Sequence, residues 1–234
     1  MKYIACKLTF ETGVHLGQGR LNETATYFCA DTLFSALCME ASKWGKINQI
    51  YEWAKEGKLF ISDAFPYIKD TLYIPKPIMP MKYNDKDFSK NKKLEQLSYI
   101  PFEKLTQYIK RTIDVEAEIK QLKTLGRREV RQMVSLTDNE HSELYSVGIY
   151  HFQKGNGLYF ILGYETEEIY VCIEELLDSL SYQGIGGKVS SGLGKYSMLP
   201  IKLPFFKKEN SIEISITTAI DKKKENRTFV LLTT

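Results

Sequence analysis

CIEELLDSLSYQGIGGKVSSGLGKYSMLPIKL, residues 172–203, predicts a helix, a glycine-rich loop and a strand in succession. In its first part leucine and isoleucine recur every three or four residues, so Cys172–Tyr182 has the apolar face of an amphipathic helix. Five of the fifteen glycines of the chain then fall within Gly184–Gly194, where glycine permits backbone angles that other residues avoid. The residues that follow predict a strand over Tyr196–Leu203, interrupted by Pro200.

The N-terminal segment predicts the first strand and the first helix. Tyr3–Phe10 alternates between apolar and polar residues, which is the pattern of a half-buried strand. After a loop that contains three glycines, Asp31 is a suitable N-cap for a helix with apolar residues at helical spacing from Leu33 to Ala41. Trp44-Gly45 ends this helix, because glycine adopts the left-handed cap conformation easily.

Shorter elements are expected in the middle of the chain. A second helix over Ile47–Lys58 precedes a short strand at Leu59–Ile61. Four prolines make Asp63–Pro80 extended and irregular, and the polar Tyr83–Lys93 is the best candidate for a mobile loop. Val115–Leu125 predicts a further helix.

Two hairpins follow this helix. Arg128–Leu136 and Leu144–Phe152 predict strands that are joined by the polar turn Thr137–Glu143. The turn QKGNG at 153–157 leads to a third strand at Leu158–Leu162. Beyond the glycine-rich loop and its strand, two more strands are predicted at Ser211–Thr217 and Thr228–Leu232.

The order strand, helix, strand, strand, helix, strand predicts an α+β fold of the ferredoxin-like (RRM-like) βαββαβ type. Its antiparallel sheet carries two helices on one face. Residues 1–203 form this domain, and a long insertion at 64–144 contains a β-hairpin. Residues 204–234 are expected to begin a second, partial ferredoxin-like domain.

Composition excludes several classes of protein. The 234 residues are 43% hydrophobic and 26% charged, which is typical of one large or two small globular domains. No stretch approaches the roughly 18–20 apolar residues that span a bilayer, and the N-terminus is not a signal peptide. Cys6, Cys29, Cys38 and Cys172 form no C-x-x-C pair and are expected to be buried, reduced thiols. We therefore expect a cytoplasmic protein without a membrane partner.

Charge is segregated along the chain, although the net charge is only +3. Between Gln183 and Lys208 there are five lysines and no acidic residue, whereas Glu165–Asp178 is rich in acids. Segregation of this kind gives a positive face that a polyanion can use. The alternative is a set of solvated surfaces with no ligand.

The glycine-rich loop has the composition of a phosphate-binding segment. Its backbone N–H groups can converge on a phosphate, while Lys188 and Lys195 supply positive charge. Its sequence fits neither a P-loop nor a dinucleotide fingerprint, both of which follow a strand and not a helix. The alternative interpretation is a flexible connection between helix and strand, for which five glycines are a high entropic cost.

GGKVSSGLGKY at 186–196, placed after an amphipathic helix, is similar to the glycine-rich signature of the RAMP superfamily of CRISPR-associated proteins. Together with segments spread over nearly the whole chain, it resembles the subunit of type III-A Csm complexes that caps the crRNA 5′ tag. These segments are VHLGQG at 14–19, ADTLFSAL at 30–37, SDAFP at 62–66, IPKP at 74–77 and ITTA at 216–219.

The resemblance implies a non-catalytic RNA-binding subunit without cofactor or metal. Such a subunit binds the crRNA 5′ tag and bridges the large polymerase/cyclase subunit and the first backbone subunit. Its projecting β-hairpin, the thumb, intrudes near the boundary between tag and guide and displaces a base pair between guide and target RNA. Here the thumb corresponds to about Arg127–Leu144, with Met133 or Val134 as a wedge beside a base.

The residues assigned to RNA binding lie in three segments. They are His15, Gly17, Gly19, Arg20, Arg127, Arg128, Arg131, Met133, Gly184, Gly186, Gly187, Lys188, Ser190, Ser191, Gly192, Gly194 and Lys195. Family members usually continue into a complete second ferredoxin-like domain, so the resemblance implies that this chain is a fragment or has a reduced second domain.

Two other functions stay open. One is a metal-independent RAMP-type endoribonuclease that matures crRNA, with His15 as general base on a ribose 2′-hydroxyl. The sequence offers His15 no catalytic partner beyond Tyr27 or Lys188. The other is a scaffold subunit with little RNA contact, which the lysine-bearing glycine loop disfavours. No D-x-D or GGDD cluster predicts a metal site.

Overall fold

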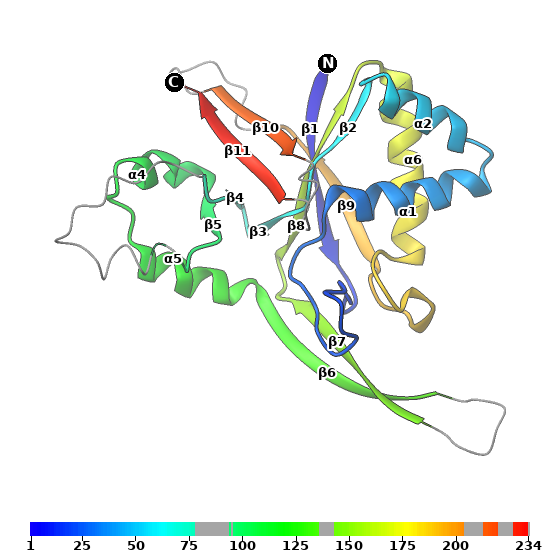
Figure 1. Ribbon diagram of the computed structural model, residues 1–234, viewed down its shortest axis with the longest axis horizontal. Coiled ribbons are helices and arrows are strands. Elements are labelled where there is room, and N and C mark those ends of the chain that lie inside the picture. The colour runs from blue at the N-terminus through cyan, green and yellow to red at the C-terminus, as the bar shows by residue number, and fades with distance from the viewer. Residues whose placement is uncertain (78–93, 95, 136–142, 204–212, 220–226, 234) are drawn as a thin grey trace.

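An antiparallel sheet with helices on one face forms the body of the protein in the computed structural model (Figure 1). The structure describes residues 1–77, 94, 96–135, 143–203, 213–219 and 227–233, the last two ranges by their backbone alone. The strands are β1 Lys2–Phe10, β2 Leu59–Ile61, β3 Phe65–Ile68, β4 Thr71–Pro75, β5 Tyr99–Pro101, β6 Gly126–Ser135, β7 Glu143–Phe152, β8 Asn156–Tyr164, β9 Tyr196–Ile201, β10 Glu213–Ala219 and β11 Arg227–Thr233. The helices are α1 Ala30–Lys43, α2 Ile47–Lys55, α4 Leu105–Ile109, α5 Val115–Leu122 and α6 Glu167–Gln183, with 3₁₀ turns η2 Phe102–Lys104, η3 Lys123–Leu125 and η4 Val189–Ser191.

Strand β8 lies at the centre of the sheet and is buried along its whole length. The strand order is β5-β4-β3-β8-β1-β9, and β2 also pairs with β8, next to the part that pairs with β3. Every one of these pairings is antiparallel. Strands β8 and β9 lie before and after α6 in the chain. Together with β1 and β2 they are arranged in the order β9-β1-β8-β2.

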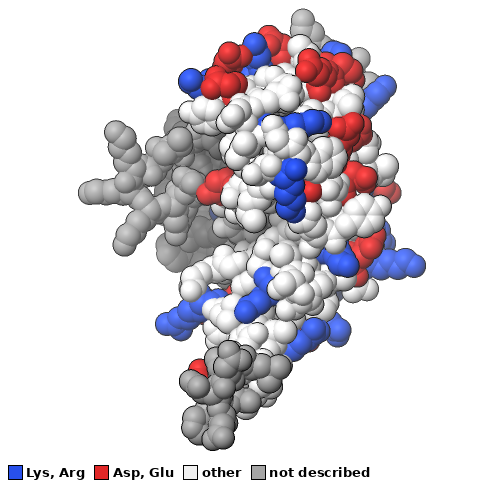
Figure 2. Space-filling view, turned by 90° about the vertical axis from the view of Figure 1, so that its right-hand side faces the viewer, with Lys and Arg blue, Asp and Glu red and all other residues white. Residues whose placement is uncertain are grey.

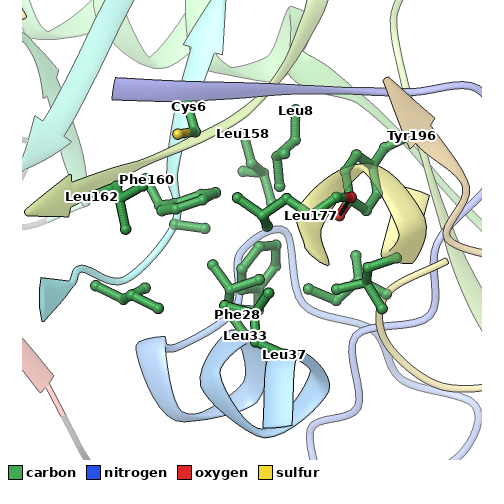
Figure 3. Close-up of a cluster of buried hydrophobic side chains, with 14 of the residues drawn as sticks. Cys6, Leu8, Phe28, Leu33, Leu37, Leu158, Phe160, Leu162, Leu177 and Tyr196 are labelled. Atoms are coloured by element: carbon green, nitrogen blue, oxygen red, sulfur yellow. Dashed lines mark hydrogen bonds between the residues drawn. The ribbon is translucent and has the colours of Figure 1, made fainter. Parts of the chain in front are cut away.

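The main core lies between this sheet and helices α1 and α6 (Figure 3). Cys6 and Leu8 of β1 and alternate residues of β8 point toward Leu33 and Leu37 of α1 and toward Leu177 of α6. The spacing of these residues puts all of them on one face of their strand or helix. Tyr196 of β9 is buried in the same cluster, and its hydroxyl donates to the carbonyl of Leu177 over 2.9 Å.

A buried carboxylate joins α1 to α6. Glu40 is only 2% exposed and accepts hydrogen bonds from Lys43 at 2.7 Å, Ser179 at 2.7 Å and Gln183 at 2.6 Å. Burial alone raises the pKa of the Glu40 carboxyl, but these three hydrogen bonds outweigh it and hold the pKa below its ordinary value. The two helices that cover the sheet are thus tied by a charged group as well as by apolar contacts.

Most elements lie where the sequence predicts them, including β1, α2, β2, the two long hairpin strands and α6, although α6 begins five residues earlier than expected. The predicted N-cap of α1 is wrong. The cap residue is Cys29, and the N–H of Ala30 donates to Asp63 Oδ1 over 2.7 Å, so a residue distant in sequence satisfies the helix end. Asp31 lies inside the first turn.

The expectation of an irregular segment at 63–80 is also wrong in part, since β3 and β4 lie within it. Pro66 is tolerated in β3 because β4 pairs only with Tyr67 and Ile68, beyond the proline. The predicted mobile loop at 83–93 and the hairpin turn, except Glu143, fall outside the described residues. Strands β10 and β11 pair with each other in a separate sheet, and the assignment of 204–234 to a second domain stays a prediction.

Strands β6 and β7 form a long two-stranded ladder that extends away from the body (Figure 1). It runs from the pair Gly126 and Phe152 to the pair Ser135 and Glu143. At its base Phe152 stacks on Phe10 of β1, with ring centroids 4.9 Å apart. The hairpin is therefore anchored to the core at one end and exposed at the other.

Candidate nucleic-acid interface

Backbone hydrogen bonds join the glycine-rich loop, residues 184–194, to the base of the β6–β7 hairpin. The segment Gly13–Leu16 lies between them. On one side Val14 exchanges two hydrogen bonds with Tyr150 of β7, of 2.9 and 2.8 Å. On the other side, the N–H of Gly187 donates to the carbonyl of His15 at 2.8 Å, and the N–H of Gly194 to that of Gly13 at 2.9 Å. The two predicted RNA-binding regions are thus brought together through a third.

Four of the five glycines in the loop are required by close packing against protein atoms. A Cβ at Gly184 would lie 2.5 Å from the carbonyl oxygen of Leu193, and one at Gly186 would lie 2.5 Å from that of His15. At Gly187 it would meet the His15 ring at 2.6 Å, and at Gly194 it would overlap the backbone of Ile185. Only at Gly192 does a Cβ meet nothing within 4 Å. The loop is therefore a packed turn and not a flexible connection.

The polar side chains of the loop face outward. Ser190, Ser191 and Lys195 are exposed, and Lys188 is partly exposed with its Nζ 4.7 Å from the centre of the Tyr145 ring of β7. Lys188 and Gly192 flank the 3₁₀ turn η4, and both have a left-handed backbone conformation. These side chains, and not the glycines, present the hydrogen-bond donors and positive charge that a phosphate backbone contacts.

His15 is buried in a structural position. It is 6% exposed, and its Nδ1 lies 2.7 Å from the carbonyl oxygen of Gly148 in β7. A carbonyl only accepts, so Nδ1 carries the hydrogen and donates it. The rest of this predicted segment, Gly17, Gly19 and Arg20, is exposed beside the loop.

The predicted arginines lie on both faces of the hairpin. Arg127, Arg128 and Arg131 are exposed, and Arg131 lies 3.1 Å from Glu129, which also lies 3.0 Å from His151. The hydrogen bond from Arg131 holds the pKa of the Glu129 carboxyl below its ordinary value. Arg131 is therefore partly neutralised by a neighbour.

Of the two wedge candidates, the structure exposes Val134 and packs Met133. Met133 contacts a small cluster formed by Val147 and Ile149 of β7 and by Leu193 of the glycine-rich loop. Val134 is 50% exposed and pairs across the hairpin with Leu144, which is 72% exposed. The exposed apolar surface of the hairpin thus lies on the face opposite Met133.

On the face drawn in Figure 2, the two ends of the molecule differ in charge. Acidic side chains gather over α2 and the N-terminal part of α6, at the top of the view. Toward the hairpin, at the bottom, Lys and Arg predominate. The predicted segregation of charge is therefore present in space as well as in sequence.

Sequence reasoning missed a pocket of about 570 Å³ that lies between the glycine-rich loop and α1. Gly186, Gly187 and Gly17 line one part of it, while Tyr27 and the exposed side of α1 line the rest. These segments are far apart in the sequence, so no local pattern points to a pocket here. Among the described residues, no group of three His, Cys, Asp or Glu side chains could hold a metal ion, and no helix has the length and apolar character that crossing a bilayer requires.

The cysteines are free thiols in the structure, and two are less buried than predicted. Cys6 and Cys172 are buried, whereas Cys29 and Cys38 are partly exposed. Burial raises the pKa of Cys6 to about 12, and burial with nearby Asp63 and Asp31 raises that of Cys29 to about 11. The thiols are therefore neutral at physiological pH and weak nucleophiles.

Curated relatives of the chain share one name, Csm4. The CRISPR system protein Csm4 of Streptococcus thermophilus is 28% identical over 94% of this chain and 73% of its own length. The Csm4 of Mycobacterium tuberculosis is 26% identical over 81% of this chain, but the match spans only 62% of that relative. The chain is similar to Csm4. No protein-family model matches the chain.

The fold is similar to that of chains in solved structures of Csm4-containing assemblies. A chain from a Csm1–Csm4 cassette in complex with cA4 has a TM-score of 0.59 at 20% identity and covers 98% of this chain and 84% of its own length. A chain from the Csm3–Csm4 subcomplex of a type III-A interference complex has a TM-score of 0.58 at 16% identity. The match covers 100% of this chain and 90% of that one. At these identities the structures establish the fold alone. The resemblance to the type III-A Csm subunit predicted from the motifs is confirmed.

Packing around the loop predicts different costs for two alanine substitutions. Gly192 and Gly194 have nearly the same left-handed φ, +80° and +79°. An added Cβ would meet backbone atoms of Ile185 at Gly194, but nothing within 4 Å at Gly192. We expect Gly192→Ala to cost about 1–2 kcal/mol of stability through φ strain alone. Gly194→Ala should cost a further 1–3 kcal/mol, roughly, because Ile185 must move. Urea unfolding of both variants measures the difference, and equal losses would show that close packing does not determine the loop.

Proposed function

We propose that this chain is the Csm4-type subunit of a type III-A Csm complex and that it binds the crRNA 5′ tag. The observation that carries the proposal is the rigid surface made by the glycine-rich loop and the exposed residues Gly17–Arg20. It presents Lys188, Lys195 and two serines on a chain similar to Csm4 over 94% of its length. Lysine, serine and backbone N–H groups are the usual contacts to nucleic-acid phosphates.

We assign the sheet and its two covering helices to the ferredoxin-like fold. The order β9-β1-β8-β2, with α1 and α6 packed on one face, fits a βαββαβ unit. In this assignment the β6–β7 hairpin is the thumb that projects from the insertion at 64–144. Val134 and Leu144, an exposed apolar pair across the two strands, are suited to pack beside a base at the tag–guide boundary of the target-bound crRNA.

The proposed partners are the large polymerase/cyclase subunit and the first backbone subunit. Support comes from the solved structures that match this fold, which are Csm1–Csm4 and Csm3–Csm4 assemblies. A chain with one positive and one acidic end can bind RNA with the first and leave the second for protein contacts. In this arrangement the subunit bridges its two neighbours.

We further propose that the subunit does not cleave RNA. His15 is 6% exposed and donates from Nδ1 to Gly148, so its side chain has a structural role at the base of the hairpin. Lys188, one of its two possible catalytic partners, has its Nζ over the Tyr145 ring. This placement supports a binding role for the segment over general-base catalysis.

Removing the two lysines tests the phosphate-binding surface. Lys188→Ala with Lys195→Ala should weaken binding of tag RNA and lower the slope of log K against log salt by roughly 0.7 for each lost phosphate contact. Filter binding at several salt concentrations measures this slope. Lys55→Ala, which removes an exposed lysine of α2, is the matched control and should leave the slope unchanged. A slope that is unaltered in the double variant would contradict the proposal.

The thumb assignment is tested at the tag–guide junction. Val134→Ser with Leu144→Ser removes the exposed apolar pair but no buried contact, so the fold should persist. In the assembled, target-bound complex, a reagent for unpaired bases should modify the junction nucleotide strongly with wild type and weakly with the variant. Val171→Ser, at an exposed position of α6, is the control. The same reactivity in all three complexes would show that the hairpin is not a thumb.

His15 distinguishes the binding subunit from the endoribonuclease. Neither wild type nor His15→Ala should shorten a precursor crRNA on a denaturing gel. His15→Asn keeps a donor near the position of Nδ1 and should retain more stability than His15→Ala, because the hydrogen bond to Gly148 is preserved. Cleavage by wild type that is lost in His15→Ala would instead support the endoribonuclease.

A further inference from the structure

Lys188 has a backbone conformation that its side chain disfavours. Its φ is +59°, in the left-handed region where a Cβ crowds the following carbonyl oxygen. The other positive-φ residues of the glycine-rich loop are all glycine, namely Gly184, Gly186, Gly192 and Gly194. Glycine would be less strained at position 188 as well, so what the lysine contributes there must come from its side chain.

The side chain of Lys188 ends on an aromatic face. Its Nζ lies 4.7 Å from the centre of the Tyr145 ring, within the roughly 6 Å over which a ring face attracts a cation. No carboxylate in the part of the chain that the structure describes forms an ion pair with Lys188. Arg131 of the hairpin, by contrast, lies 3.1 Å from Glu129. The ring therefore holds the ammonium group of Lys188 without cancelling its charge.

Tyr145 is itself held in place by the base of the hairpin. It is partly buried and packs against a cluster formed by Val147, Ile149 and Leu193. Leu193 belongs to the glycine-rich loop, so this cluster and the contact with Lys188 join the loop to the hairpin at two points. The place at which the ring holds the ammonium group is thus set before any RNA is bound.

A lysine that contacts a phosphate normally loses side-chain freedom on binding. Its four-carbon stem has one of the largest rotamer entropies among side chains, and this freedom is lost when the ammonium group is fixed on an anion. A lysine that is already held over a ring has lost part of that freedom in the unbound protein, which favours binding. The ring face takes up one side of the ammonium group, and N–H donors on the other side are available to a phosphate oxygen.

We propose that Tyr145 is a positioning residue for RNA binding, whose ring holds the Lys188 ammonium group where a phosphate of the bound strand contacts it. The proposal rests on the phosphate contact of Lys188 in the proposed function, and it adds a hairpin residue that acts through that lysine. The phosphate-binding surface is then built partly by the hairpin. The strained backbone of Lys188 directs its side chain across to β7.

Substitutions at Tyr145 test this role in the full chain with tag RNA. Tyr145→Leu keeps an apolar side chain against the cluster but removes the ring. It should weaken binding roughly two- to fivefold, as expected for an exposed contact between a cation and a ring. Tyr145→Phe keeps the ring and should bind as wild type. Because Lys188 keeps its charge, the slope of log K against log salt should not change in either variant.

The chain offers a matched control on α2. The ring of Tyr51 lies 5.8 Å from the Nζ of Lys55, so the same kind of contact occurs there, away from the glycine-rich loop. Tyr51→Leu removes this ring and should leave the affinity for tag RNA unchanged.

A second series leaves the packing of the hairpin almost unaltered. Increasingly fluorinated phenylalanine at position 145 keeps nearly the same shape, while each fluorine withdraws electron density from the ring face. Affinity for tag RNA should fall stepwise along the series, because the ring face attracts the ammonium group less. This series decides the question even if urea unfolding shows that Tyr145→Leu disrupts the fold.

A double-mutant cycle separates positioning from general support of the fold. Lys188→Met keeps a long side chain on the ring but removes the charge, so it should lower the affinity and reduce the salt slope by roughly 0.7. In this background Tyr145→Leu should have no further effect on RNA binding. An equal loss of affinity in both backgrounds would show that Tyr145 only supports the fold, and the proposal would be wrong.

The remaining outcomes distinguish this proposal from the proposed function. Tighter binding by Tyr145→Leu would show that the ring competes with phosphate for Lys188, and constant affinity along the fluorinated series would show that the ring face has no role. Either result overturns the positioning role, while a reduced slope in Lys188→Met still supports the phosphate contact. If Lys188→Met changes neither affinity nor slope, the phosphate contact of Lys188 fails and the positioning role fails with it.

Discussion

Hydrogen bonds along Gly13–Leu16 determine how the glycine-rich loop and the base of the β6–β7 hairpin, the parts proposed to face RNA, are placed. The segment pairs with β7 through Val14 and with the glycine-rich loop through Gly13 and His15. Buried backbone groups need partners, so neither the loop nor the base of the hairpin can shift without leaving N–H or C=O groups unpaired. The His15 side chain adds a third bond to the hairpin, at Gly148. Loop and hairpin therefore form one surface of fixed geometry.

This constraint explains the glycines better than direct phosphate contact does. The sequence correctly disfavours a flexible connector, since five glycines in eleven residues would make an unstructured loop costly to order. The reason that the sequence suggests for the glycines, direct contact with phosphate, is however not the one that the structure shows. Gly186 and Gly187 lie against His15, and Gly194 lies against Ile185, so the missing side chains allow protein backbones to approach one another. The outward positions between these contacts hold the serines and lysines, whose chemistry suits RNA.

The parts of the fold that depend on local periodicity could be predicted from the sequence. Strand β1, helix α6 and the hairpin strands have clear two-residue or three-to-four-residue patterns. The parts that depend on distant partners could not. Asp63 caps α1 across 33 residues of sequence, and β3 forms in a proline-rich segment because β8 lies beside it. The pocket combines three separate segments, and its acidic residue was mistaken for a helix cap.

The distribution of charge likewise depends on the fold and cannot be read from the composition. A net charge of +3 says little about a nucleic-acid partner, yet on the face drawn in Figure 2 acidic side chains gather over α2 and α6, and Lys and Arg predominate toward the hairpin. The acidic end disfavours the approach of a polyanion, and the end that Gly13–Leu16 holds in place favours it. Along that surface the positive side chains are outside the pocket and the acidic Asp31 is inside it. The fold, more than the composition, therefore creates the positive surface on which the proposed RNA-binding function depends.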